Sequence, residues 1–493
     1  MLGLVFASGT ALAQKQTVSL TTTVARGNDL TLLVNASAQG LKVDWGDGVA
    51  VAVSPAQGPS PLLKIEGTVQ GESLRLYCDE NLTFLDCEQC GLTELGLEEA
   101  RDLHSLYCAH NALSVLNLRK MHRLVHLDCS HNELSRLIFS SYDRKRASED
   151  LPLIEQLDLS HNKFSAAFNW HLPSLRHLNI SGNRFTSAEI DAPSLQLLHC
   201  ADNQLRGILQ LRQSEQLQSL LAFNNQHTGL DVYHKGERME QLFCDSCRLR
   251  SLDLEAADGL KDLSCSDNQL RKLVMPVGAQ LSSLNVSGNG LDFSVLPTKR
   301  LAPAYLSFMP QQPFDFKEVE GVLLKEHIPY VPLSESWYQR HDIDLSSKGS
   351  LTGNHHDARY TWYRIGTDGS SHEMTQRKSS SGTGDFYLSR GLTAFFTPHK
   401  KAYVKMVSRA YGYTIESVPI AIGDDITGIE NLTVDGGGLQ MTVESSCLLF
   451  TGNGAVAIFT PAGKCIWKGS VEGREQVALP HGIYIVNKVK VVL

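Results

Sequence analysis

Hydrophobic residues recur at fixed spacings along the middle of the chain, between residues 82 and 291. The recurring phrase is Leu-x-x-Leu-x-(Cys/Leu)-x-x-(Asn/Cys)-x-Leu, as in Leu103, Leu106, Cys108, Asn111 and Leu113. Its ninth place falls at Cys90, Asn111, Asn132, Asn162, Asn183, Asn203, Asn225, Cys247, Asn268 and Asn289. Subtracting successive numbers gives steps of 20 to 22 residues, with one step of 30. A short phrase that returns at such a period predicts a stack of similar coils.

Each phrase predicts one short strand around its Leu-x-Leu centre, and the strands of successive coils are expected to pair in parallel about 4.8 Å apart. The leucines at the first, fourth and sixth places point inward, and only stacking can bury them. The asparagine at the ninth place leaves the strand at a turn, where its amide is expected to bond the backbone of its own and neighbouring coils. A coil of about 21 residues has no room for a long helix, so short strand-like or 3-10 segments are expected on its convex side.

Cysteine occupies the sixth place in six coils, at Cys87, Cys108, Cys129, Cys200, Cys244 and Cys265. The other four coils hold Leu159, Ile180, Ala222 and Val286 at this place. Because cysteine interchanges with apolar residues here, we interpret these thiols as small, reduced core residues. The period and the phrase are those of leucine-rich repeats. Short coils with a column of cysteines resemble the internalin J branch of bacterial leucine-rich repeat proteins, over roughly residues 65–300.

Two C-x-x-C pairs, Cys87/Cys90 and Cys244/Cys247, have a spacing that is also found at zinc sites. They lie seven coils apart, on the order of 34 Å at one strand spacing per coil, so they cannot share an ion. In each pair the second cysteine stands in the asparagine place. We therefore interpret both pairs as parts of the repeat, and we expect no metal and no cofactor.

The chain begins with an apolar run that ends in Ala11-Leu12-Ala13, which is typical of a secretory signal with its cleavage site; we assign residues 1–13 to it. Residues 14–66 alternate in the manner of strands and are expected to form a β-rich N-terminal cap. The WGDG phrase at residues 45–48 predicts a hairpin. It resembles the start of polycystic-kidney-type β-sandwiches and the caps of surface leucine-rich repeat proteins. Asp44 and Asp47 leave calcium binding open, with a plain turn as the alternative.

The step of 30 residues contains a polar insertion around residues 140–150, about nine residues beyond the usual period. Insertions in solenoids form loops on one face, and such loops often bind partners. The alternative is a surface loop that the fold merely tolerates.

The repeats are expected to occupy residues 67–300, and the pattern changes after them. Prolines at positions 297, 303, 310 and 313 predict a C-cap and linker over residues 301–324. Residues 325–422 contain short apolar runs separated by Gly/Ser-rich turns, which is typical of an Ig-like β-sandwich. Trp362 is expected to fill the core of this sandwich from a central strand.

Residues 423–493 resemble the C-terminal sorting domain of the type IX secretion system. The resemblance rests on residues 455–464 (AVAIFTPAGK), 479–486 (LPHGIYIV) and 488–493 (KVKVVL). It implies a small antiparallel β-sandwich that directs export across the outer membrane and attachment to the outer cell surface, and it leaves open whether the domain is then cleaved. The sequence leaves open whether Cys447 and Cys465 pair, which requires their strands to adjoin.

Composition and motifs narrow the classes of function. A net charge of −8 argues against nucleic-acid binding, which usually needs a basic face. No apolar run beyond the N-terminus is long enough to cross a membrane. The sequence contains no GxSxG, HExxH, P-loop or pre-helical GxGxxG phrase, so we do not expect an enzyme. His110, His131 and His161 share the eighth place of three successive coils, and we interpret them as solvated turn residues rather than a metal site.

The remaining candidate for function is a surface, because the third and fifth places of each coil are expected to face outward on the concave side. An acidic region surrounds Asp128 and Asp158, and an apolar patch is formed by Leu197, Leu221 and Phe243 with Phe223 beside them. The alternative is that these apolar side chains only pack on each other or on a cap. The candidate partner-binding residues are Tyr107, His126, Asp128, Asp158, His177, His199, Leu221, Phe223 and Phe243.

Together these patterns predict a mainly β chain: a leucine-rich repeat solenoid with short 21-residue coils, then an Ig-like β-sandwich and a small C-terminal β-sandwich. We interpret the protein as a secreted, monomeric, adhesin-like binding protein attached to the outer cell surface. Its expected partner is a host or bacterial surface protein or glycan, in addition to the export machinery. The resemblance to internalin J-like proteins of Bacteroidetes implies host attachment or biofilm formation. The alternatives are a carrier or inhibitor of a secreted partner enzyme, and an enzyme within residues 325–422.

Overall fold

The structure of the protein is a computed structural model. The expected signal segment, residues 1–13, and residues 141–146 of the insertion lie outside its described residues. The described residues are 16–35, 37–53, 60–79, 81–140, 147–211, 214–232, 238–276, 280–315, 327–328, 343–351, 355–378, 383–389, 392–396, 399–422, 432–434, 439–444, 447–459, 465–478, 483–486 and 489–492.

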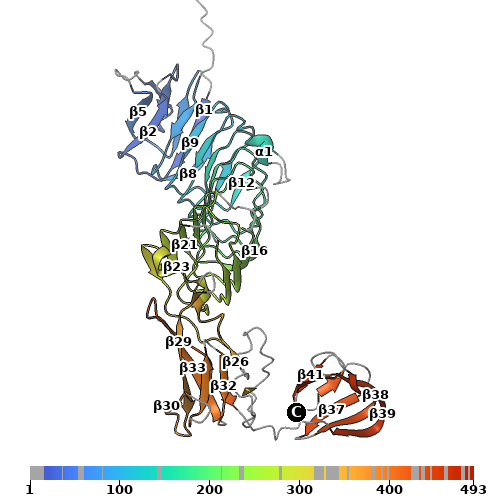
Figure 1. The fold of residues 1–493 in the computed structure, drawn as a ribbon. Coiled ribbons are helices and arrows are strands. Elements are labelled where there is room, and N and C mark those ends of the chain that lie inside the picture. Colours follow the sequence, from blue (N-terminus) through green and yellow to red (C-terminus); the bar gives the residue numbers. More distant parts are fainter. Residues whose placement is uncertain are drawn as a thin grey trace, which may run out of the picture. The chain divides into compact units, whose positions relative to one another are not determined.

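The coils build one long parallel sheet (Figure 1). Each coil contributes a three-residue strand, and the register places the third, fourth and fifth residues of one coil beside those of the next. The strands are β7 (Phe84–Asp86), β9 (Ser105–Tyr107), β11 (His126–Asp128), β13 (Gln156–Asp158), β14 (His177–Asn179), β15 (Leu197–His199), β17 (Ser219–Leu221), β19 (Gln241–Phe243), β21 (Asp262–Ser264), β23 (Ser283–Asn285) and β24 (Tyr305–Ser307). The predicted solenoid and its period are confirmed.

Burial along each strand follows the repeat phrase. In β9, Leu106 is fully buried, whereas Ser105 and Tyr107 on either side of it are half-exposed. Burial raises the pKa of the Cys108 and Cys129 thiols well above the ordinary value, so these thiols stay uncharged. The predicted interior column of reduced cysteines is confirmed, because all six are free and 0 % exposed: Cys87, Cys108, Cys129, Cys200, Cys244 and Cys265.

A ladder of asparagines ties the coils together. The Asn132 Nδ2 donates to the Cys108 carbonyl of the preceding coil at 2.9 Å, and to the carbonyls of Cys129 and Ser130 at 3.2 and 3.1 Å. Its Oδ1 accepts the N–H of Leu113, the eleventh place of the preceding coil, at 3.0 Å. Each such amide bonds four backbone groups of two adjacent coils, and its Oδ1 satisfies a buried N–H. The same bonds recur at Asn111, Asn162, Asn183, Asn203, Asn225, Asn268 and Asn289.

The eighth place of each coil adopts a left-handed backbone conformation. The φ angles lie between 50° and 68° at Gln89, His110, His131, His161, Gly182, Asp202, Asn224, Ser246, Asp267 and Gly288. Only two of these residues are glycine. Among the other residues, Asn, Asp and His are several-fold enriched in this region. The short polar side chains of Asn and Asp can hydrogen-bond the local backbone there. The backbone turn therefore accounts for the recurrence of histidine at this place.

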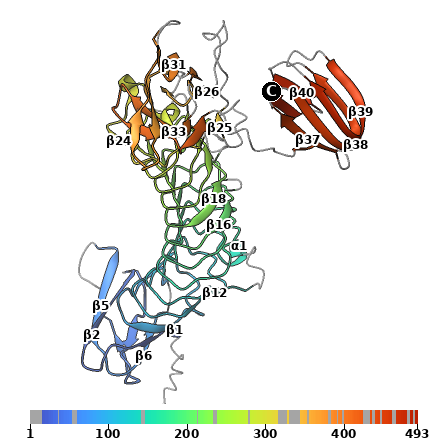
Figure 2. The same cartoon turned by 90° about the horizontal axis from the view of Figure 1, so that it is seen from below.

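The convex side carries short strands, as predicted, and no long helix among its described residues (Figure 2). These strands pair in parallel between neighbouring coils, so that six of the coils contribute a short strand to each side of the solenoid. The pairs are β10 (Val115–Asn117) with β12 (Arg136–Ile138), β16 (Arg206–Leu209) with β18 (Gln226–Leu230), and β20 (Ser251–Asp253) with β22 (Lys272–Val274).

The insertion ends in a single helical turn, α1 (Ala147–Asp150), whose last residue is buried. The Asp150 carboxylate accepts the backbone N–H groups of Lys120 and Ser140, both at 2.6 Å, and the Ser140 hydroxyl at 2.7 Å. A buried carboxylate that accepts three hydrogen bonds is a strong anchor. The end of the insertion is therefore fastened to the coils on which it lies.

The N-terminal strands continue both sides of the solenoid. Strands β2 and β5 pair with each other, and β2 pairs with β7, which brings the long sheet to thirteen strands. On the other side, β1 pairs with β8 of the first coil. Buried residues such as Leu20, Leu32 and Val43 cover the open end of the core. The strands are β1 (Gln16–Thr22), β2 (Asp29–Asn35), β3 (Lys42–Asp44), β4 (Ala50–Ala52), β5 (Leu62–Thr68), β6 (Ser73–Tyr77) and β8 (Leu92–Gly96).

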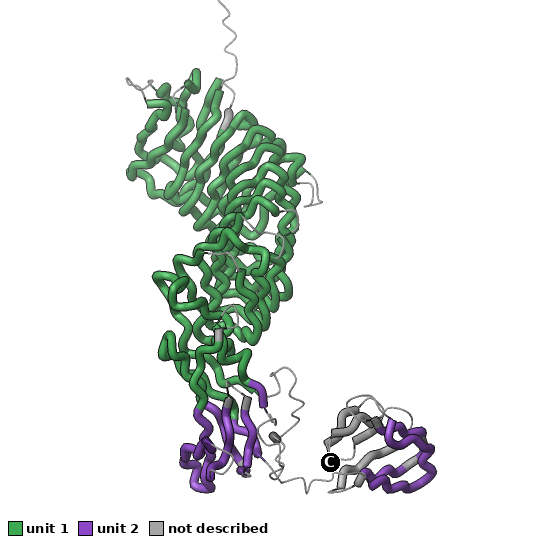
Figure 3. The backbone as a smooth tube through the Cα atoms, in the orientation of Figure 1, with its two compact units in different colours: residues 1–318, 345–360, 405–418 green, residues 319–344, 361–404, 419–493 purple. Residues whose placement is uncertain are grey.

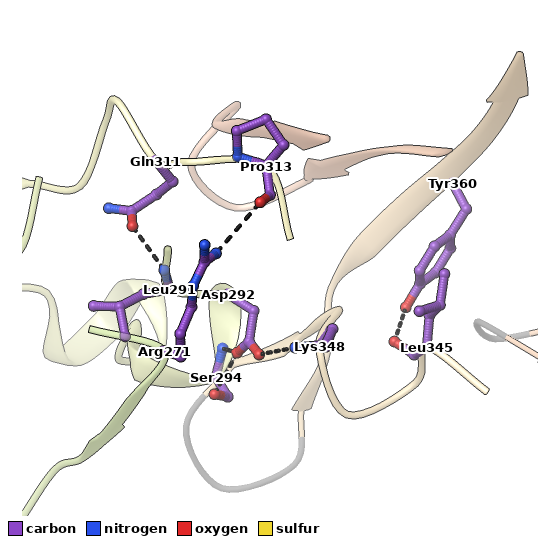
Figure 4. A network of polar contacts seen from close by, with 9 residues as sticks. All are labelled: Arg271, Leu291, Asp292, Ser294, Gln311, Pro313, Leu345, Lys348 and Tyr360. Atoms are coloured by element: carbon purple, nitrogen blue, oxygen red, sulfur yellow. Dashed lines mark hydrogen bonds and ion pairs between the residues drawn. The ribbon is translucent and has the colours of Figure 1, made fainter. Parts of the chain in front are cut away.

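The region expected to be a C-cap and linker contains one more coil. Strand β24 pairs in parallel with β23, although the repeat phrase is no longer evident there. Gln311 takes the asparagine place (Figure 4): its Oε1 accepts the Leu291 N–H at 2.8 Å, and its Nε2 donates to the Val286 carbonyl at 2.9 Å. Two 3-10 turns, η3 (Phe293–Val295) and η4 (Lys299–Leu301), precede this coil.

Residues 345–360 and 405–418 belong to the same compact unit as the coils (Figure 3). The Lys348 ammonium lies 3.2 Å from the Asp292 carboxylate, and both side chains are largely buried. The Tyr411 hydroxyl donates to the Pro297 carbonyl at 2.8 Å, and the Tyr413 ring stacks on Phe308. The end of the solenoid is therefore closed by segments from more than 50 residues further along the chain.

The strands between residues 327 and 422 form two main sheets. One has the order β25-β35-β33-β29-β30 with β34 also on β33, and the other has the order β26-β32-β31. Trp362 of β29 is fully buried and meets Phe395 of β32 edge to face at 4.7 Å, so it fills the space between the sheets. The strands are β25 (His327–Ile328), β26 (Ile343–Asp344), β27 (Ser350–Leu351), β28 (His355–His356), β29 (Ala358–Ile365), β30 (Ser371–Glu373), β31 (Phe386–Ser389), β32 (Leu392–Phe395), β33 (His399–Ser408), β34 (Thr414–Glu416) and β35 (Ile420–Ile422).

The C-terminal strands form one antiparallel sheet in which the long β38 pairs with β37, β39 and β40. Cys447 lies opposite Ala478 at one end of the β38–β39 ladder, and Cys465 lies opposite Phe459 at the other end. The strands adjoin, but the two cysteines lie at opposite ends of the ladder and the Cys465 thiol is free, so the pairing that the sequence left open is not formed. The strands are β36 (Leu432–Val434), β37 (Leu439–Glu444), β38 (Cys447–Phe459), β39 (Cys465–Ala478), β40 (Ile483–Val486) and β41 (Val489–Val492).

Candidate functional site

The fifth-place residues of successive coils form one row across the long sheet. Tyr107 of β9 lies beside Asp128 of β11, which lies beside Asp158 of β13. Further along the row, His199 of β15 is followed by Leu221 of β17 and Phe243 of β19. The structure therefore brings the predicted acidic residues together at one end, and two of the predicted apolar residues together at the other.

The third-place row holds the remaining histidine candidates. His126 of β11 and His177 of β14 are separated by Gln156 of β13, so they are not neighbours. The Ser105 Oγ and the His126 Nδ1 lie 3.2 Å apart, within hydrogen-bond distance. Phe223 lies outside the strands, two residues after Leu221 at the seventh place, and its side chain is half-exposed.

Three carboxylates, those of Asp86, Glu88 and Asp128, surround Tyr107, and Asp158 lies beside Asp128 in the next strand; we call these four residues the acidic group. Burial raises the pKa of Tyr107, and the charges of Asp128, Asp86 and Glu88 raise it further. Burial also raises the pKa of Glu88, and its neighbours Asp86 and Asp128 add to that shift. The Phe84 and Tyr107 ring centroids lie 5.5 Å apart within this group. The result is a concentration of negative charge around an aromatic pair.

Lysine and arginine are absent from this face. Lysine and arginine occur at none of the third, fifth and seventh places of the eleven coils. At the second place, by contrast, acids have basic partners in the next coil: Glu155 lies 3.5 Å from Arg176, and Glu240 lies 2.8 Å from Lys261. No described lysine or arginine forms an ion pair with the acidic group.

The last coil adds an aromatic residue that sequence reasoning missed. Tyr305 of β24 occupies the third place and is 76 % exposed, in register with Ser283 of β23. We had no reason to place it on the face, because the full phrase ends at Leu291. The available signal was the spacing of Leu306, Phe308 and Gln311, which matches the fourth, sixth and ninth places.

The three eighth-place histidines stack face to face. The ring centroids of His110 and His131 lie 4.2 Å apart and those of His131 and His161 4.3 Å apart, with interplanar angles of 11° and 16°. Imidazole binds a metal in its ring plane at about 2.0–2.1 Å, so parallel rings at this spacing cannot converge on one ion. Burial lowers the pKa of His131, and His161 and His110 lower it further, against the effect of Asp158 and Asp128. The stack is therefore a row of turn residues.

The carboxylate of Asp44, a candidate calcium ligand, already bonds groups of the turn and Arg75. Its Oδ1 accepts the N–H groups of Gly46 and Gly48 at 2.9 and 3.0 Å, and its Oδ2 lies 3.2 Å from Arg75 Nη1. Burial raises the pKa of Asp44, but these hydrogen bonds and the Arg75 charge outweigh it, so the pKa is lowered. Asp47 likewise accepts the N–H of the residue two positions on, at 2.9 Å. These contacts are those of a plain turn.

The second cysteine of each C-x-x-C pair replaces a ladder asparagine. The Cys90 thiol donates to the carbonyls of Thr31 and Glu88, both at 3.3 Å, and Cys247 makes the equivalent contacts. Within the described part of the chain, no group of three or more His, Cys, Asp and Glu side chains is placed to hold a metal ion. None of the helices described there is long and apolar enough to cross a membrane.

The stacked coils, the asparagine ladder and the open strand face form a solenoid of the leucine-rich repeat kind. The Leucine Rich Repeat family model matches residues 174–193. No curated protein matches the chain.

Three solved structures resemble the chain in fold. YopM from Yersinia pestis is 21 % identical with a TM-score of 0.35, and the match covers 51 % of this chain and 60 % of YopM. The functional domain of InlJ from Listeria monocytogenes, which includes a cysteine ladder, is 16 % identical with a TM-score of 0.31 over 72 % of this chain and 93 % of that domain. The internalin InlF from Listeria monocytogenes is 13 % identical with a TM-score of 0.20, and the match covers 42 % of this chain and 81 % of InlF.

Proposed function

We propose that the chain is a non-enzymatic binding protein that recognises a protein partner through the open face of its long sheet. The partner places basic side chains on the acidic group and apolar side chains on the patch at Leu221 and Phe243. The observation that carries the proposal is the exclusion of lysine and arginine from the third, fifth and seventh places of the coils.

The electrostatic argument concerns carboxylates that have no counter-charge of their own. Like charges that stand close together destabilise the free protein slightly, and they attract and orient a cationic partner. Carboxylates at the second place are neutralised within the fold, for example Glu155 by Arg176. Those of the acidic group are left for a partner. Tyr107, which lies among them, adds a ring face that favours a guanidinium or ammonium group.

Neutralising the acidic group tests this proposal. In the full-length protein, Asp128→Asn combined with Asp158→Asn is expected to weaken partner binding about tenfold or more, because two charge-assisted contacts are lost. The partner is first captured with the full chain from host extracts and from neighbouring bacteria, and its affinity is then measured at several salt concentrations. The double variant is expected to show a smaller salt dependence.

The control carries the same charge change outside the face. Glu155→Gln combined with Glu240→Gln removes two paired carboxylates, so binding is expected to stay within about twofold of the unmodified protein. Equal losses in both double variants would contradict the proposed site. Loss of binding after the partner is deglycosylated would instead assign recognition to a glycan.

We further propose that the protein acts outside the cell, attached to the outer surface as an adhesin. The proposal is supported by the apolar N-terminal run and by the C-terminal phrases at residues 455–464 and 479–493. Truncation after Ile420 is expected to abolish surface display, measured by antibody labelling of intact cells, while the protein is still made. Undiminished display of the truncated chain would refute the sorting role.

A further inference from the structure

One core position departs from the repeat phrase in the coil that carries Leu221 and Phe223. Among the ten coils that carry the full phrase, nine hold leucine or phenylalanine at the eleventh place, whereas this coil has His227. The His227 side chain is 1 % exposed, and among the described residues neither of its ring nitrogens has a hydrogen-bond partner. A buried imidazole without partners is unfavourable, because it loses its hydrogen bonds to water and gains none.

The asparagine ladder is also broken at this point. In other coils the eleventh-place N–H is accepted by the next asparagine, as the Leu249 N–H is by Asn268 Oδ1 at 3.0 Å. The next coil has Cys247 in place of the asparagine. The backbone N–H groups of Asn225 and His227 therefore donate to the Cys247 sulfur atom. Sulfur is a weak acceptor compared with an amide oxygen. Two independent weaknesses therefore coincide at one junction between coils.

In the described part of the chain, no charged group compensates the burial of His227. Burial is the only cause that lowers the pKa of this imidazole, to about 4. Two buried thiols belong to the adjoining coils: that of Cys247, whose pKa burial raises to about 11, and that of Cys200, whose pKa burial also raises. Arg206 and Arg248, which flank it on the neighbouring segments, are exposed. The imidazole is therefore neutral at pH 7, and nothing nearby stabilises its cation.

We propose that the coil of residues 217–232 is an acid-sensitive element: when His227 takes up a proton, this coil opens and the Leu221/Phe223 part of the face lets its partner go. The opening concerns the free protein, whereas the release of a partner rests on the proposed function. Protonation favours opening because the described part of the closed core offers the His227 imidazolium neither a hydrogen-bond acceptor for its N–H groups nor a carboxylate for its charge.

The direction with pH follows from the two protonation equilibria. The open coil binds the proton with the ordinary histidine pKa of 6.5, and the closed coil with a pKa of about 4. The closed state therefore keeps its full stability above pH 6.5 and loses it as the pH falls from 6.5 to 4. Between pH 7 and pH 4.5 the opening equilibrium constant is expected to rise about 60-fold.

Amide hydrogen exchange on the full chain tests the acid-sensitive element. The exchange rate of each amide in residues 220–232 is divided by its intrinsic exchange rate, which gives the opening equilibrium constant. These constants are compared at pH 7 and pH 4.5. In the unmodified protein, exchange there is expected to rise about 60-fold relative to β9 and β11, far from this coil. His227→Leu restores the repeat phrase and is expected to remove this difference, whereas His227→Gln is expected to exchange faster at both pH values without the acid response.

His122→Leu, at an exposed position, serves as the control and is expected to keep the acid response. An unchanged response in His227→Leu, or a response spread evenly over all coils, would overturn the proposal. Partner affinity at pH 7 and pH 5 is a separate measurement. If acid opens the coil but affinity stays constant, partner release is refuted while the opening stands. If no binding is found at pH 7, the proposed function fails and the exchange result is unaffected.

Discussion

Replacing Asn132 with alanine is expected to lower the free energy of unfolding by about 3–5 kcal/mol. The side chain is 8 % exposed, and its amide bonds three carbonyls and one N–H, from its own coil and from the preceding one. Alanine leaves the Leu113 N–H without its acceptor in the interior, which costs about 1–3 kcal/mol, and removes three further hydrogen bonds that are each worth about 0.5–1.5 kcal/mol. Urea unfolding followed by circular dichroism measures the change.

The matched control is Asn117→Ala on the convex strand β10. Asn117 is only half-buried, and its Oδ1 accepts one N–H, that of Arg119, at 3.2 Å. Water can replace this bond, so the loss is expected to stay below about 1 kcal/mol. If both variants lost the same stability, the ladder would be contributing no more than a surface asparagine.

Charging the apolar patch is expected to reduce partner affinity about 100-fold. Leu221 and Phe243 are neighbours in the register of β17 and β19 and are half-exposed. Leu221→Asp combined with Phe243→Asp removes two apolar contacts and leaves two carboxylates to be desolvated in the interface. Contacts of this kind are each worth about 1–2 kcal/mol, and a total of about 2.7 kcal/mol corresponds to a factor of 100 in the dissociation constant. The dissociation constant for the captured partner is measured by biolayer interferometry with the full chain.

The control for this variant is Ile208→Asp, on the convex strand β16. Ile208 is 62 % exposed, so the substitution adds a charge at an apolar surface position away from the proposed site. Affinity and melting temperature are expected to stay close to those of the unmodified protein. Full-strength binding by the Leu221/Phe243 double variant would remove the patch from the binding site.

The repeat phrase was sufficient to predict the coil, the inward leucines and the cysteine column, because one local pattern is repeated ten times. Each copy specifies which side chain of a strand is buried, and a shift by one residue would expose the whole hydrophobic set. For the same reason the fifth-place row could be written down from residue numbers alone, from Tyr107 and Asp128 to Leu221 and Phe243. The assignment of a partner to that row remains a prediction.

Residues that depart from the phrase could not be placed in this way. Gln311 occupies the asparagine place of a coil whose leucines are mostly replaced, and its role shows only in its bonds to Leu291 and Val286. Asp150 looked like part of a polar loop, whereas its carboxylate is buried under the backbone of Lys120 and Ser140. In each case the partners come from another coil, and their approach is not encoded in the local pattern.

The sequence by itself determined that this chain winds into stacked coils with a cysteine interior, because burial of periodic leucines allows no other arrangement of the strands. Only the tertiary structure decided how the stack ends and where it is weak. Closing segments such as residues 345–360 arrive from far along the chain, and the junction of His227 with Cys247 joins residues of two different coils. Such contacts depend on which residues meet in space, and the energy of a buried polar group is set by those neighbours and not by its own identity.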